Sequence, residues 1–229
     1  MSENFYKSIV ICEGSTDKII FEDVLKKIGL TEKIEVNKEP SHGKWEAIDI
    51  FKIFIKALSP RLVFIELDLD DKTPEELYKE VDECIELNSK NGVYNYNNCT
   101  GVVIPVGLEF VRERWGVNKL AIEDYILSLI SIETVFENFK NDRKGHGTKI
   151  EHNHKDIIEK MNEIIEISRN QKFHLNTSKA CLEIFMAITG VQVSIPSLSR
   201  LLIQATDEKT IKEIFSNILD IFNKHLEKE

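Results

Sequence analysis

Acidic residues stand directly after two of the most apolar stretches of the chain. Glu13 follows the β-branched run 8–12, and Asp68-Leu69-Asp70 follows the run 62–67. Carboxylates that converge at one place raise each other's pKa values, and a hard cation among them relieves the repulsion. Mg²⁺ prefers oxygen ligands and completes its shell with waters and substrate phosphates. It can then polarise a phosphoryl oxygen, activate a water or hold a leaving oxygen.

A parallel β-sheet would bring these acids to one place. Short apolar runs that read as strands alternate with segments of helical periodicity over the first half of the chain: strands 8–12, 34–36, 62–67 and 100–106, and helices 17–28, 45–58 and 74–87. This alternation predicts an α/β fold with a mainly parallel sheet flanked by helices. Because ligands bind beyond the carboxyl ends of the strands in such sheets, we expect Glu13 and Asp68 at one edge.

The alternation of side chains along a strand also predicts which side of the sheet each acid faces. If the third strand continued past residue 68, Asp68 and Asp70 would face one side and Leu69 would pack into the core. Glu13, which comes from another strand, would complete the cluster.

The second half of the chain is predicted to be helical. Residues 88–98 read as a loop rich in Asn and Gly, and 140–153 as a flexible polar excursion. Helical periodicity fills most of the remainder: 122–139, 155–168, 178–188, 196–205 and 208–226. We therefore expect an α/β domain over residues 1–130 and a helical extension packed on it over 131–229.

The two acidic motifs carry a family resemblance. Residues 10–18, Val-Ile-Cys-Glu-Gly-Ser-Thr-Asp-Lys, followed by Asp68-Leu69-Asp70, resemble the Toprim domain of topoisomerases, bacterial-type primases, RNA-maturation nucleases and OLD (overcoming lysogenization defect) nucleases. The form Glu-Gly-x-x-Asp with a following Lys is most similar to the OLD-like and RNA-maturation branches. The chain has no GxxxxGK[ST] motif, so it resembles a stand-alone Toprim protein.

This resemblance implies roles for the acids of the first half. Glu13 matches the Toprim glutamate, a metal ligand or general acid–base catalyst. Asp17 matches a further aspartate of the OLD-like branch, and Asp68 and Asp70 match the metal-binding pair.

Two residues of the second half also match the OLD-like pattern. Glu123 stands where that branch has another acidic ligand, and Lys179 matches a lysine that stabilises charge. Ala121 replaces the serine that the branch often has two residues before the acid. The alternative for Glu123 and Lys179 is an ordinary solvated charge, since charged residues are mostly exposed.

Composition limits the partners. With 42% hydrophobic and 30% charged residues among 229, the chain can bury a normal core. A formal net charge of −9 argues against a protein that coats duplex DNA, although bound Mg²⁺ would reverse the local sign. No apolar run approaches the ~20 residues that span a bilayer, so we expect no membrane contact and a cytoplasmic protein.

We therefore expect a nuclease or phosphoryl-transfer protein that acts on DNA or RNA with Mg²⁺ or Mn²⁺, of the kind that serves DNA repair. The alternative is a catalytically inactive Toprim-like module that binds nucleic acid or protein. The amphipathic late helices leave a homodimer open. Trp45 and Trp115 are expected to be packing residues.

Overall fold

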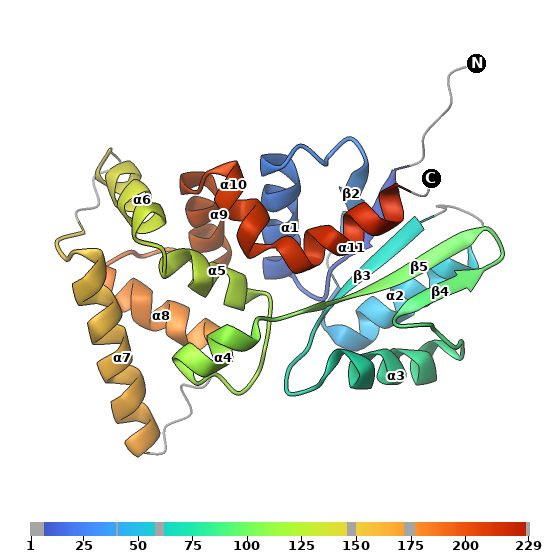
Figure 1. Ribbon diagram of the computed structural model, residues 1–229, viewed down its shortest axis with the longest axis horizontal. Coiled ribbons are helices and arrows are strands. Elements are labelled where there is room, and N and C mark those ends of the chain that lie inside the picture. The colour runs from blue at the N-terminus through green and yellow to red at the C-terminus, as the bar shows by residue number, and fades with distance from the viewer. Residues whose placement is uncertain (1–6, 40, 58–61, 146–149, 172–176, 228–229) are drawn as a thin grey trace. The chain divides into compact units, whose positions relative to one another are not determined.

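A five-stranded sheet forms the centre of the first half of the chain. The computed structural model describes residues 7–39, 41–57, 62–145, 150–171 and 177–227 (Figure 1). The strands lie in the order β2-β1-β3-β5-β4. Their bounds are β1 Ser8–Ile11, β2 Ile34–Val36, β3 Leu62–Asp68, β4 Val93–Tyr96 and β5 Cys99–Val106.

Most strand pairs are parallel. β1 pairs with β2 and β3, and β3 with β5, all in parallel, whereas β4 is antiparallel to β5. The predicted α/β class with a mainly parallel sheet is thus confirmed. β4 falls within the predicted loop 88–98, where asparagines break the apolar pattern. It forms because Tyr94 is buried and its ring packs edge-on against Phe51 at 5.9 Å.

Helices cover both faces of this sheet: α1 Ser15–Lys27, α2 Lys44–Lys56, α3 Pro74–Ile85 and α11 Ser216–Leu226. Phe222 of α11 lies 4.8 Å from Phe64 of β3 and 6.2 Å from Phe21 of α1, measured between ring centroids, so α1 and α11 share one face. On the other face α2 approaches closely. A Cβ at Gly101 would lie 2.5 Å from Ile55 Cδ1.

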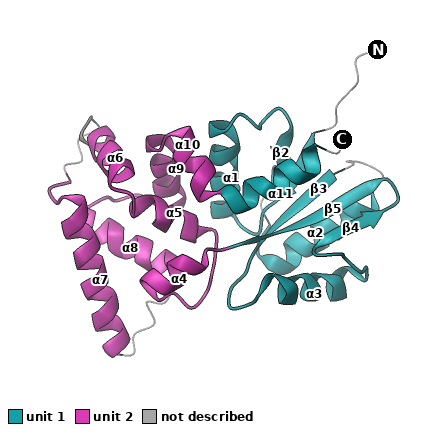
Figure 2. Ribbon diagram, in the orientation of Figure 1, with its two compact units in different colours: residues 1–106, 216–229 teal, residues 107–215 magenta. Residues whose placement is uncertain are grey.

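The chain divides into two compact units (Figure 2). The first comprises residues 1–106 and 216–229, and the second residues 107–215. This division differs from the expected boundary at residue 130. The last helix belongs to the first unit because Phe222 packs on Phe64.

The second unit consists of helices: α4 Glu109–Trp115, α5 Glu123–Ile130, α6 Glu133–Gly145, α7 His154–Asn170, α8 Ser178–Thr189, α9 Ile195–Ala205 and α10 Glu208–Ile214. The helical character of the second half is therefore confirmed, although α4 was not predicted. Residues 124–130 of α5 are all buried, and Tyr125 stacks on Phe215 with ring centroids 4.7 Å apart. Part of the predicted excursion is helical to residue 145, and residues 146–149 lie outside the described chain. No described helix is both long and apolar enough to cross a membrane.

Candidate functional site

The carboxyl ends of β1 and β3 flank the point where the strand order along the sheet changes direction. β1 leads into α1 on one face of the sheet, and β3 leads into α3, which packs on the other face with α2. Open α/β sheets bind ligands in the crevice at such a point. The backbone N–H of Asp68 donates to Glu13 Oε2 at 3.3 Å, so both acids lie at this edge, as expected.

Glu66 is a third acid at this edge, and sequence reasoning missed it. Its side chain is 0% exposed, and Oε2 accepts a hydrogen bond from the Glu13 N–H at 3.2 Å. Oε1 has no hydrogen-bond partner among the described residues. Burial, and then the charges of Asp17, Asp68 and Glu13, raise the pKa of Glu66 well above its ordinary value.

The sequence did contain a signal for Glu66. Strands of a parallel sheet that is covered on both faces are usually apolar throughout. A glutamate between Ile65 and Leu67 therefore departs from the pattern of its own strand. The departure is not a surface feature, because β3 is the middle strand of five.

Asp17, Glu66 and Asp68 lie on the side of the sheet that α1 covers, and we call them the α1-side acids. Since side chains alternate along a strand, Glu66 and Asp68 share the face of Phe64, which meets α11. Asp17 stands in the first turn of α1 and is 7% exposed. An acid in a first turn is stabilised by the helix dipole.

Glu13, Lys44, Asp70 and Glu80 gather on the opposite side, and we call them the Lys44 cluster. The Lys44 ammonium lies 3.3 Å from Asp70 Oδ2 and 3.8 Å from Glu80 Oε2, and its side chain is 10% exposed. It also donates to the Asp68 carbonyl at 3.4 Å. Burial raises the pKa of Glu13, and Lys44 opposes this shift. The ammonium therefore balances part of the acidic charge here.

The strand pattern predicted that the side chains of Asp68 and Asp70 face the same side of the sheet, and in the structure they do not. β3 ends at Asp68, and Asp70 takes a left-handed backbone conformation with φ 55°. That turn directs the Asp70 carboxylate to Lys44. Leu69 is 8% exposed and packs inward, as expected.

These acids form no ready-made metal cage. Among the residues that the structure describes, no three His, Cys, Asp or Glu side chains are grouped so that they could hold a metal ion. The donors present still suit Mg²⁺, because they are all oxygens and Glu66 Oε1 lacks a partner. Mg²⁺ also usually binds through one or two carboxylates plus waters and phosphate oxygens.

Glu123 and Lys179 belong to the second unit. Glu123 begins α5, where burial raises its pKa and the charge of Lys179 lowers it, so these two side chains are neighbours. The more deeply buried acid is Asp124, which sequence reasoning did not single out. It accepts hydrogen bonds from the N–H groups of Leu108 at 2.9 Å and Ala121 at 3.2 Å.

Ser178 Oγ also donates to Asp124 Oδ1, which ties the start of α8 to α5. Burial raises the pKa of Asp124 to about 6. With one carboxylate serving three donors, Asp124 has a structural role in joining segments of this unit.

No protein-family model, curated protein or solved structure matches the chain. The Toprim resemblance thus depends on the motifs around Glu13 and Asp68 alone.

Proposed function

We propose that the shared edge of β1 and β3 binds Mg²⁺ or Mn²⁺ and uses it for phosphodiester chemistry on DNA or RNA. Glu66 is the observation that supports this most. A carboxylate buried without a cation is costly, so the fold alone gives no reason to place one in the middle strand. Strongly perturbed acids in a crevice are typical of functional sites.

Different residues of this edge would have different tasks. Glu13 and Asp68 would supply carboxylate oxygens to the metal, with Asp17 and Glu66 adding negative charge behind them. The metal would supply charge neutralisation at a phosphoryl oxygen and a more acidic water. Burial raises the pKa of Glu13, which brings it closer to the range in which a carboxyl group exchanges protons with a reacting oxygen. Lys44, already held beside Asp70, would offer positive charge to a phosphate.

A binding module without turnover is the second candidate. It is favoured by the Lys44 ammonium, which already balances part of the charge of Glu13, Asp70 and Glu80 without a metal. The net charge of −9 also disfavours tight metal-free contact with phosphates. This candidate predicts nucleic-acid or protein binding with no cleavage in any divalent metal.

A cleavage assay separates the two candidates. Labelled single-stranded and duplex DNA and RNA are incubated with the chain in Mn²⁺, in Mg²⁺ and in EDTA. We expect cleavage with metal only, loss of cleavage in Asp68→Asn, and wild-type cleavage in Asp71→Asn. Asp71 is a matched control because it is an exposed acid three residues further along. Absence of cleavage by the wild type in both metals would favour the binding module.

For Glu123 and Lys179, the roles that the resemblance implies are a proposal about the second unit taken by itself. If they take part in the chemistry, Glu123→Gln and Lys179→Ala should lower the cleavage rate while circular dichroism shows the chain to remain folded. Unchanged rates would leave both as ordinary charges of the second unit.

A further inference from the structure

Trp45 is an exposed aromatic side chain next to the acidic edge. It is 60% exposed, whereas Trp115 in the second unit is 1% exposed. The prediction that both tryptophans are packing residues is therefore confirmed for Trp115 and wrong for Trp45. A ring of this size left in water loses the free energy that burial would provide. Trp45 directly follows Lys44 in the chain, and the Lys44 ammonium contacts Asp70.

The backbone that carries Trp45 is anchored to the site. The N–H of Gly43 donates to the Glu13 carbonyl at 3.1 Å, and the N–H of His42 to Glu46 Oε2 at 2.7 Å. Gly43 has a φ of 117°, a conformation that side chains rarely adopt, so the turn before α2 needs glycine. These contacts hold the backbone at the start of α2, and with it the Cα of Trp45, close to Glu13.

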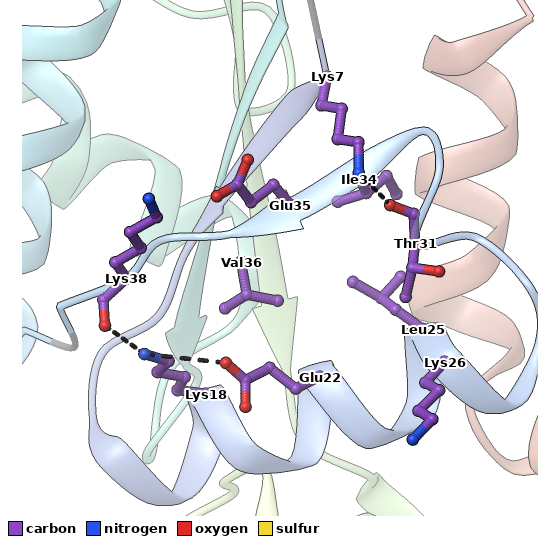
Figure 3. A pocket seen from close by; sticks show the side chains of 10 residues that line it. All are labelled: Lys7, Lys18, Glu22, Leu25, Lys26, Thr31, Ile34, Glu35, Val36 and Lys38. Carbon is purple, nitrogen blue, oxygen red and sulfur yellow. Dashed lines mark hydrogen bonds and ion pairs between the residues drawn. The ribbon is translucent and has the colours of Figure 1, made fainter.

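A pocket rich in lysine lies between α1 and β2, and Lys18 and Lys38 line it near the carboxyl ends of the strands. It has a volume of about 400 Å³ and is lined by α1 and β2, with Lys7, Lys18, Lys26 and Lys38 against Glu22 and Glu35 (Figure 3). Figure 3 shows Lys18 donating to the Lys38 carbonyl, just beyond the carboxyl end of β2. Because β2 is parallel to β1, Lys38 and Glu13 follow strands that end at the same edge. This excess of cations occurs in a chain of net charge −9.

Aromatic rings and cations around a phosphate-directed site suit nucleic acid with unpaired bases. Single strands bind through bases stacked on aromatic side chains and a positive surface that follows the backbone. A base inside a duplex has both faces covered by its neighbours and cannot stack on a side chain unless it is flipped out. An exposed ring beside the acids therefore favours substrates that are single-stranded there.

We infer that the substrate is nucleic acid that is single-stranded at the acidic edge, with an unpaired base stacked on Trp45 and its backbone following Lys18 and Lys38. This inference rests on the proposed function, because it takes the acidic edge as the place where the phosphate reacts. It adds the strandedness of the substrate and the residues that read it.

Equilibrium binding of fluorescein-labelled oligonucleotides tests the inference without turnover, with Ca²⁺ replacing Mg²⁺. The full-length chain is titrated into a single-stranded oligonucleotide and into its duplex. Trp45→Ala should weaken single-strand binding by about 5- to 150-fold, the range expected for one stacked base. Trp45→Phe should retain most of the affinity. Ile53→Ala is the matched control, since Ile53 is an apolar side chain of α2 that is 67% exposed.

Several results would overturn the inference. One is single-strand affinity that is equal in Trp45→Ala and wild type. Another is a loss of affinity in Trp45→Ala that is equal for the duplex and the single strand. A third is absence of oligonucleotide binding by the wild type, which would leave Trp45 as a contact for a protein partner. Because the proposed function is tested by cleavage and Asp68→Asn, a chain that cleaves normally with Trp45→Ala refutes the stacking alone. A chain that binds through Trp45 but never cleaves refutes the enzyme alone.

Discussion

Replacing Glu66 with glutamine should make the first unit more stable at neutral pH, and increasingly so as the pH rises. Burial and the α1-side acids raise the pKa of Glu66 above its ordinary 4.5. The folded chain therefore keeps the proton at pH values where the unfolded chain has released it. A raised folded pKa gives stability that is fully present below the unfolded pKa and is lost as the pH rises through the folded pKa. Glutamine has nearly the same shape and cannot ionise.

The size of the effect follows from one proton. The unfolding free energy of the wild type should fall relative to Glu66→Gln by about 1.4 kcal/mol for each pH unit above 4.5, until the folded pKa is passed. Glu66 is 0% exposed, so solvent does not screen the effect. The amide keeps one oxygen as an acceptor for the Glu13 N–H. Its NH₂ group would take the place of Oε1, which has no hydrogen-bond partner among the described residues.

The assay is urea unfolding followed by far-ultraviolet circular dichroism at pH 5, 6 and 7. Titrations of groups far from Glu66 are common to the two chains and cancel in the difference. Glu35→Gln is the control, because Glu35 is exposed on β2 of the same sheet. A difference between wild type and Glu66→Gln that stays constant across these pH values would refute the assignment of Glu66 as a buried acid with a raised pKa.

Two further predictions concern single contacts. Lys44→Met removes a nearly buried cation from among the three acids of the Lys44 cluster and should lower the unfolding free energy by about 1–3 kcal/mol. In thermal melts, Mg²⁺ should stabilise this variant more than wild type. The comparison is Lys52→Met on the same helix, which loses a pair with the exposed Glu86 and a hydrogen bond to the Cys84 carbonyl, and should gain nothing from Mg²⁺. The pKa of Asp124 is raised from 3.8 to about 6 in the folded chain. The protonated carboxyl therefore adds to the free energy of unfolding, and about 3 kcal/mol of this free energy is lost as the pH rises through that range. Asp124→Asn should remove that pH dependence in unfolding curves followed by the fluorescence of the buried Trp115, and a curve with wild-type pH dependence would contradict it.

The local elements were largely predictable because they depend on local patterns. β-branched runs between turn residues predicted four of the strands, and helical periodicity predicted most helices. β4 was not predicted because Asn95 interrupts the apolar pattern of a very short strand. The membership of α11 in the first unit was not predicted for another reason. It depends on the contact of Phe222 with Phe64, which lies far away in the sequence.

The candidate site was predictable only in part. That Glu13 and Asp68 meet follows from strand order and the rule for parallel sheets, both of which can be inferred from sequence. The place of Asp70 depends on one backbone angle after β3, and a strand pattern says nothing about it. The partial neutralisation by Lys44 and the exposure of Trp45 likewise depend on how α2 begins. Glu66 was included in the predicted third strand but was not recognised as a member of the site.

Titration of the chain with Mn²⁺ by isothermal calorimetry tests most directly whether the edge of β1 and β3 is a metal site. We predict binding by the wild type with release of protons, because a cation favours ionised carboxyl groups at Glu66 and Glu13, whose pKa values are raised. Asp68→Asn should abolish this binding, and Asp71→Asn should keep it. Wild-type heats in Asp68→Asn, or absence of binding by the wild type at millimolar Mn²⁺, would contradict the metal site and the function proposed from it.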